Sequence, residues 1–176
     1  MAVETNPYGD KSNLMETLIH QHGDSLLRLC FMYLGDRAMA EDALQDTFIK
    51  AYRALDKFRG DSSYKTWLTR IAVNVCKSIR RSAWMRHVDR NKSLDNLPAG
   101  DVPFEMADDT VIRAVMSLPE HQRTVILLYF YQGFRVPEIA QLLSVPVSTV
   151  SSQLQRGKAR LKNDLKGWYY DEEDLP

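Results

Sequence analysis

The side chains that could do chemistry in this sequence are concentrated in residues 137–161, PEIAQLLSVPVSTVSSQLQRGKARL. Ser144, Val145 and Pro146 predict a turn between two helices at about 136–143 and 147–166, with Val145 buried. The apolar residues that fall on the inner faces are Ile139, Ala140 and Leu143 in the first helix and Val147, Val150, Leu154 and Leu161 in the second. This spacing predicts a helix-turn-helix, in which the small Ala140 lets the second helix pack closely.

The outward residues of the second predicted helix suit the major groove of duplex DNA. Small hydrogen-bonding side chains come first, where a recognition helix meets base edges, and cations for the flanking phosphates follow. The candidate residues for contacts with duplex DNA are Ser148, Thr149, Ser151, Ser152, Gln155, Arg156, Lys158 and Arg160. An ordinary helical hairpin with a solvated polar face is the alternative. The agreement between the inner spacing and the outer basic series favours DNA binding.

A second set of cations lies on a helix expected from about residue 64 to residue 84. Arg70, Asn74, Lys77 and Arg81 follow i, i+4, i+7 and i+11 spacing, so they form one stripe. Three more residues, Lys65, Thr66 and Thr69, extend the stripe, and Arg80 adjoins it. Phe58 and Arg59 lie in the loop before the helix, and Tyr64 and Trp67 lie in its first turn. Cations interleaved with aromatic rings are typical of single-stranded DNA binding, because rings stack on unpaired bases, at about 1–3 kcal/mol per base. The alternatives are a solvated stripe with Tyr64 and Trp67 in the core, and for Trp67 the spacing to Ile71 favours burial.

The elements that must position these side chains are all predicted to be helices. Residues 12–34 show one apolar face that ends at Gly35, and Asp36 is expected to cap a second helix. In that helix the residues at helical spacing are Ala40, Ala43, Leu44, Thr47, Phe48, Ala51 and Leu55. No segment alternates with period two. We therefore predict an all-α fold of two small helical domains, residues 1–92 and 108–176, joined by a flexible linker at 93–107.

Charge and composition narrow the class of protein. The net charge is zero, but residues 64–92 and 121–167 are basic, whereas residues 93–120 and 171–174 are acidic. Two basic faces on a neutral chain suggest two contacts with nucleic acid. The sequence has no apolar run of membrane-spanning length and no secretion signal. Cys30 and Cys76 are expected to be small buried hydrophobic residues in a reducing compartment, so the chain is predicted to be cytoplasmic.

An enzyme is not expected from this sequence. His20 and His22 are two residues apart and cannot share a helical face. The sequence holds no HExxH, CxxC, phosphate-binding loop or nucleophile elbow. We therefore predict no catalytic residue, no metal and no cofactor.

Two long segments carry a family resemblance. AEDALQDTFIKAYRALDKFRGDSSYKTWLTRIAVNVCKSIRR, followed after a linker by LPEHQRTVILLYFYQGFRVPEIAQLLSVPVSTVSSQLQRGKARL, resembles an extracytoplasmic-function (ECF) sigma factor of bacterial RNA polymerase. The similarity covers about residues 12–84 and 108–166. It implies promoter-specific transcription initiation with core polymerase and promoter DNA as partners, control by an anti-sigma factor, and no insertion of the chain into a membrane.

The resemblance also implies roles for individual residues. The second helix would dock on the clamp coiled coil of polymerase through Asp42, Gln45, Asp46, Ile49 and Arg53. The minus-ten element would be captured and melted by Phe58, Arg59, Ser62, Lys65, Trp67, Arg70, Asn74, Lys77 and Arg81. The helix-turn-helix would bind the minus-thirty-five element, with the polymerase flap as a further contact. A stand-alone regulator that binds duplex DNA as a dimer is the alternative, but it leaves the loop and the stripe unexplained.

The chain departs from the family pattern in its last third. Ser144 stands where the turn often has glycine, and Ser151 and Gln153 are neutral where cations are common. Gly157 interrupts the recognition helix at a cost of about 1 kcal/mol relative to alanine. Arg135, Val136 and Pro137 stand where the family usually has small and aromatic residues before the first helix of the motif. These departures concern the bases that are read and leave the predicted fold unchanged.

Overall fold

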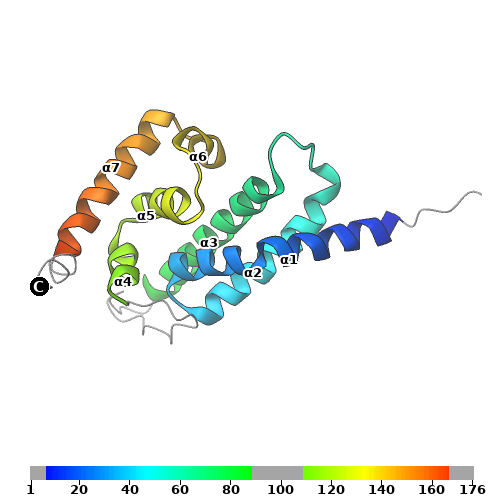
Figure 1. Ribbon diagram of the computed structural model, residues 1–176. Coiled ribbons are helices and arrows are strands. Elements are labelled where there is room, and N and C mark those ends of the chain that lie inside the picture. The colour runs from blue at the N-terminus through cyan, green and yellow to red at the C-terminus, as the bar shows by residue number, and fades with distance from the viewer. Residues whose placement is uncertain (1–6, 89–108, 167–176) are drawn as a thin grey trace, which may run out of the picture. The chain divides into compact units, whose positions relative to one another are not determined.

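The computed structural model describes residues 7–88 and 109–166, and within these ranges it contains helices, turns and no strand. The chain divides into two compact units, residues 1–99 and 100–176 (Figure 1). The predicted all-α fold is therefore confirmed for the described residues. The predicted linker at 93–107 lies outside them, and the domain limits at 92 and 108 stay predictions.

The described part of unit 1, residues 7–88, is a bundle of three α-helices, each packed against the other two. They are α1 (Pro7–Leu34), α2 (Arg37–Ala54) and α3 (Tyr64–Val88), and a short 3-10 turn, η1 (Leu55–Lys57), follows α2. The core lies between them and includes the fully buried Leu18, Leu29, Tyr33 and Leu68. Helical periodicity in the sequence predicted all three helices.

The junction between α1 and α2 follows the predicted capping chemistry. Gly35 adopts a φ of 74°, the left-handed conformation in which glycine ends a helix without a side-chain clash. The Asp36 carboxylate accepts a hydrogen bond from the Met39 backbone N–H at 2.7 Å. Such a cap contributes about 1 kcal/mol. It fixes where α2 begins and therefore which residues α2 turns outward.

Within residues 109–166, unit 2 contains four α-helices. They are α4 (Asp109–Ser117), α5 (Glu120–Ile126), α6 (Val136–Leu143) and α7 (Val147–Asp164). A π-helical turn, η3 (Leu127–Tyr131), continues α5 and ends before Gly133, which has a φ of 73°. At the start of α6 the Glu138 carboxylate accepts a hydrogen bond from the Arg135 backbone N–H at 2.6 Å, which caps the helix.

Gly157 allows α5 and α7 to pack at close range. It is buried in α7, and a Cβ atom at this position would lie 2.8 Å from Cγ1 and 3.2 Å from Cδ1 of Ile126. Ile126 is itself buried in α5. The sequence showed only that Gly157 weakens the helix. The structure shows why a residue without a side chain is needed there, because Ile126 of α5 packs against this position.

Two valines, one in the turn and one at the start of the recognition helix, correct the sequence prediction. Val145 and Val147 were expected to be buried, but 36% and 49% of their surfaces are exposed. The buried residues of α7 are Val150, Leu154 and Gly157. The spacing predicted the inner face correctly for Val150 and Leu154, whereas Leu161, predicted on the same face, is half-buried. The core of unit 2 begins on α7 at Val150, so Val147 lies beyond it.

Candidate nucleic-acid interface

The predicted stripe on α3 lies largely on the surface. Lys65, Arg70, Asn74 and Arg81 are exposed, and Lys77 is half-buried. Thr69 was expected to extend the stripe, but it is fully buried. It shares i, i+3, i+4 and i+7 spacing with Ala72, Val73 and Cys76, which are buried as well, so it belongs to the inner face. The stripe is therefore narrower than predicted.

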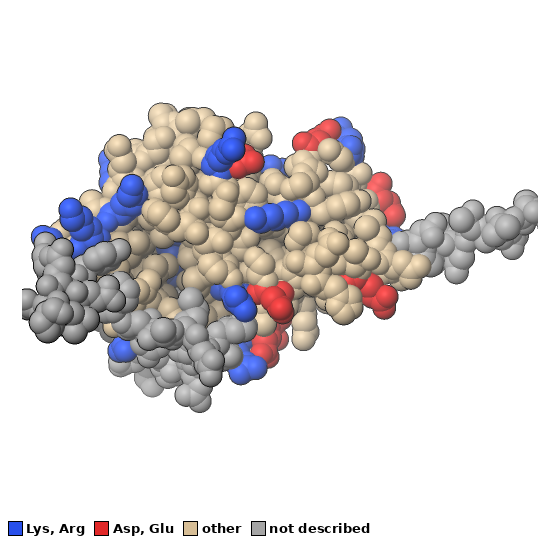
Figure 2. All heavy atoms as spheres, viewed as in Figure 1, with Lys and Arg blue, Asp and Glu red and all other residues tan. Residues whose placement is uncertain are grey.

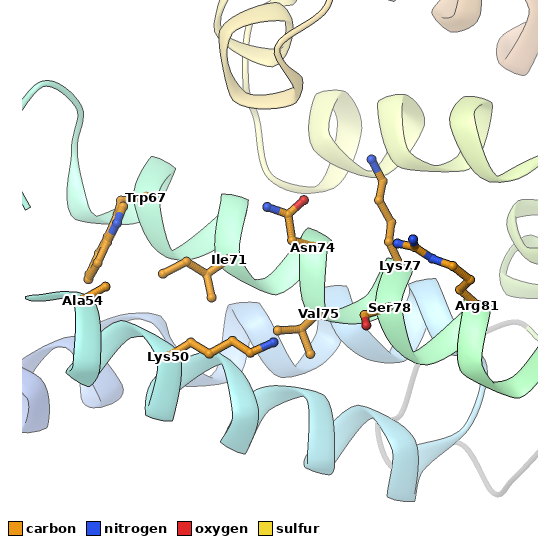
Figure 3. Close-up of a pocket in the computed structure, with 9 residues that line it drawn as sticks. All are labelled: Lys50, Ala54, Trp67, Ile71, Asn74, Val75, Lys77, Ser78 and Arg81. Carbon is orange, nitrogen blue, oxygen red and sulfur yellow. The ribbon is translucent and has the colours of Figure 1, made fainter.

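A groove runs between α2 and α3 beside this stripe (Figure 3). Its volume is about 550 Å³, within the range of pockets that hold small organic ligands. Apolar side chains and polar or cationic side chains both line it: Ala54, Trp67, Ile71 and Val75 are the first kind, and Lys50, Asn74, Lys77, Ser78 and Arg81 are the second. Figure 3 shows Lys50 extended along α2 towards Val75, while the ends of Asn74 and Lys77 point away from α2.

Lys50 is the residue of this groove that the sequence analysis missed as a site. Lys50 lies on the exposed face of α2. No periodicity within one helix reveals that Lys50 lines the same groove as Asn74 and Arg81 of another helix. The cationic spacing on both helices was the available signal, and only the packing of α2 on α3 connects them.

Three aromatic rings organise the loop at the end of the groove. The ring centroid of Phe58 lies 4.6 Å from that of Tyr64 and 5.0 Å from that of Trp67. All three side chains are half-buried, so neither full burial nor full exposure of Tyr64 and Trp67 is correct. The Ser63 hydroxyl oxygen accepts a hydrogen bond from the Thr66 backbone N–H at 3.1 Å and caps α3. The cluster holds the loop, with exposed Arg59 and half-buried Ser62, against the start of α3.

The outer face of α2 presents the residues proposed for docking. Asp42, Gln45, Asp46, Ile49 and Arg53 are all exposed. Ile49 is 47% exposed, which places an apolar side chain in the middle of an acidic and polar surface. Such a surface is typical of a protein interface with a polar rim.

The helix-turn-helix has the predicted order of helix, turn and helix, and its inner face differs from the prediction in α6 as well as at Val147. Leu142 of α6 is buried, whereas Leu143 is only half-buried. Ser144 adopts the left-handed conformation, with φ 56° and ψ 46°, and the Val145 backbone N–H donates to the Ala140 carbonyl at 3.0 Å. This turn fixes the angle at which α7 leaves α6.

The outward face of α7 carries the predicted reading residues. Ser148, Thr149, Gln155, Arg156, Lys158 and Arg160 are exposed, and Ser151 and Ser152 are half-buried. The Ser152 hydroxyl donates to the Thr149 carbonyl at 2.9 Å, so its lone pairs stay available to accept a hydrogen bond. On the face shown in Figure 2, cationic side chains gather along the C-terminal half of α7 with no acidic side chain among them.

The two cysteines are buried free thiols, as predicted. A hydrogen bond between the Cys30 and Cys76 side chains, together with burial, raises the pKa of the Cys76 thiol above its ordinary value. Raised thiol pKa values disfavour the reactive thiolate. In the described part of the chain no group of three or more His, Cys, Asp or Glu side chains is arranged to hold a metal ion. None of the helices described here is long and apolar enough to cross a membrane.

Comparison with known proteins decides the family. Residues 18–86 match the model of sigma-70 region 2, and residues 108–161 match that of sigma-70 region 4. Relatives named ECF RNA polymerase sigma-E factor are 35% identical to the chain over 83% of their own length. The chain belongs to the ECF sigma factors. Region 2 falls in unit 1, with the groove and the aromatic cluster, and region 4 falls in unit 2, with the helix-turn-helix.

Relatives and solved structures agree with the assignment to the ECF sigma factors. The chain is 35% identical to the ECF RNA polymerase sigma-E factor of Escherichia coli K12, over 84% of this chain and 83% of that protein. It is 30% identical to the RNA polymerase sigma-H factor of Pseudomonas aeruginosa, over 93% of this chain and 92% of that protein. The sigma factor RpoE of Bartonella quintana, solved in complex with the anti-sigma factor NepR, has a TM-score of 0.71 and 26% identity, covering 86% of this chain and 96% of RpoE. CnrH, solved with the cytosolic domain of CnrY, has a TM-score of 0.67 and 25% identity, covering 89% of this chain and 90% of CnrH.

Proposed function

We propose that this ECF sigma factor directs core RNA polymerase to its promoters by reading two DNA elements with two different surfaces. Unit 1 captures an unpaired strand at the minus-ten element, and unit 2 binds the minus-thirty-five element as duplex. The observation that carries this proposal is the presence, in one chain, of a groove lined in part by cations and an exposed recognition helix with polar and cationic side chains.

The groove of unit 1 suits one extruded base with its flanking phosphates. Half-buried Ile71 can cover a face of the base, and the exposed Asn74 amide can donate to and accept from its hydrogen-bonding edge. Lys50, Lys77 and Arg81 provide positive charge for phosphates. Trp67, held by Phe58, offers a ring on which a neighbouring base can stack.

The recognition helix of unit 2 suits base edges in the major groove. Arg156 can donate two hydrogen bonds to guanine, and Gln155 can pair with adenine, each contact discriminating by about 1–3 kcal/mol. Lys158 and Arg160, further along α7, contact phosphates. Ser148, Thr149, Ser151 and Ser152 contribute shorter hydrogen-bonding side chains near the start of the helix.

The remaining partners follow from the exposed surfaces and the family. The face of α2 around Ile49 docks on the clamp coiled coil of polymerase, and unit 2 contacts the flap. An anti-sigma factor restrains the chain, as the complexes of RpoE with NepR and of CnrH with CnrY support. The chain acts in the cytoplasm by binding and carries no enzymatic activity of its own.

One experiment separates the two DNA-reading roles. Holoenzyme assembled with Asn74→Ala should bind promoter duplex but show reduced permanganate reactivity of thymines in the melted region. Holoenzyme with Arg156→Ala should lose preference at one or two positions of the minus-thirty-five element, by about 1–3 kcal/mol. Asn13→Ala, at an exposed asparagine of α1, is the control and should match the wild type. Full permanganate reactivity of Asn74→Ala would contradict the role of the groove.

A further inference from the structure

The first turn of α7 exposes an apolar side chain where a recognition helix meets DNA. Val147 is the first residue of α7 and 49% of its surface is exposed. Its neighbours Ser148 and Thr149 are exposed and polar. This β-branched apolar residue at the tip of an otherwise polar surface is only partly covered by unit 2, whose buried residues on α7 begin at Val150.

The position of Val147 in the helix directs it towards base edges. Side chains of an α-helix lean towards its N-terminus, so the side chain of a first-turn residue extends beyond the helix end. The N-terminal residues of a recognition helix contact base edges in the major groove. Val147 lies four residues before Ser151 and eight before Gln155, so the three residues lie along one side of α7.

Valine can discriminate one feature of a base edge. It has neither a donor nor an acceptor, so it cannot read the hydrogen-bonding pattern. The C5-methyl group of thymine is the apolar group that the major groove presents, and apolar side chains contact it. We propose that Val147 is a specificity-determining residue that reads the methyl group of a thymine in the minus-thirty-five element. This inference rests on the proposed function of unit 2 as the duplex reader.

Val145 provides a matched control on the same molecule. It is also an exposed valine, at 36%, but it lies in the turn before Pro146 and not on α7. Its backbone N–H is engaged with Ala140, which ties it to the end of α6. If exposure of a valine near the DNA were enough, Val145 and Val147 would behave alike.

The test begins with selection of minus-thirty-five elements by wild-type holoenzyme from a promoter library randomised at that element. Each selected thymine, on either strand, is then replaced by deoxyuridine, which removes only the methyl group. At one position this replacement should weaken binding of wild-type holoenzyme about fourfold, which corresponds to ~0.8 kcal/mol for one buried methyl group. Val147→Ala should bind the thymine and deoxyuridine promoters equally, whereas Val145→Ala should keep the fourfold difference.

The outcomes separate this inference from the proposed function. No sequence enrichment by wild-type holoenzyme would contradict duplex reading by unit 2 itself. Enrichment with no thymine-to-deoxyuridine effect, or with an effect that Val147→Ala retains, would overturn the assignment of Val147 alone. If Val145→Ala lost the effect and Val147→Ala kept it, Val145 in the turn would be the residue that contacts the methyl group. Circular dichroism of both variants should match the wild type, because neither side chain is buried.

Discussion

Replacing Gly157 by alanine should loosen the contact between α5 and α7. Alanine favours a helix over glycine by about 1 kcal/mol, which on its own would stabilise unit 2. The added Cβ, however, would lie 2.8 Å from Cγ1 of Ile126, an atom near the base of a buried side chain that cannot swing away. Overpacking of this kind costs about 1–3 kcal/mol. The net expectation is a loss of about 1 kcal/mol in the free energy of unfolding of unit 2.

Hydrogen exchange measured by mass spectrometry on the full chain can detect this loss. Peptides from α5 and α7 in Gly157→Ala should exchange about fivefold faster than in the wild type, since 1 kcal/mol changes the open fraction about fivefold. Ala159→Gly, at an exposed position of the same helix, isolates helix propensity and should cost about 1 kcal/mol without any clash.

A double-mutant cycle then assigns the effect to the contact itself. Ile126→Ala should cost less in the Gly157→Ala background than in the wild type, because the clashing atoms are gone. If Gly157→Ala instead slowed exchange relative to the wild type, by the same factor by which Ala159→Gly speeds it, only helix propensity would be at work. That result would refute the close approach of the two helices. Additive effects of Gly157→Ala and Ile126→Ala would refute it as well.

Two further predictions concern docking and the turn. Asp46→Arg should weaken binding to core polymerase at least about tenfold, because it reverses a charge in the docking face. Asp24→Arg, at an exposed position of α1, is the control and should not weaken binding. Equal pull-down of core by both variants would contradict the assignment of this face. Ser144→Gly should stabilise unit 2 by about 0.5–1 kcal/mol, because Ser144 holds a left-handed φ of 56° that glycine adopts freely. Thermal unfolding at or below the wild-type temperature would show that the serine is not strained there.

The sequence predicted elements and faces well, because periodicity and caps are local properties. Gly35 and Asp36 mark the junction of α1 and α2 through chemistry within four residues, and the structure confirms both. The prediction that Thr69 belongs to the exposed stripe was wrong for a related reason. Its polarity suggested the stripe, but its spacing to Val73 places it on the inner face, and in the packed bundle the position decides.

Properties that depend on tertiary packing were not predictable from spacing. Val147 has core spacing, yet periodicity carries no information on where the body of unit 2 ends. The need for Gly157 appears only when Ile126 is brought against it from another helix. The groove likewise is lined by Lys50 of α2 and Asn74 of α3 together, a relation between residues far apart in the sequence.

The division of work between the chain and polymerase can be measured directly with a promoter selected by the holoenzyme. Opening duplex DNA costs on average about 1.4 kcal/mol per stacked step, more than one groove and one loop can supply for a whole bubble. Core polymerase plus this chain should therefore melt and transcribe the promoter. The purified chain alone should show only weak binding that falls steeply with salt. Nanomolar, promoter-specific binding by the chain alone at physiological salt, with no transcript when core is added, would contradict the account.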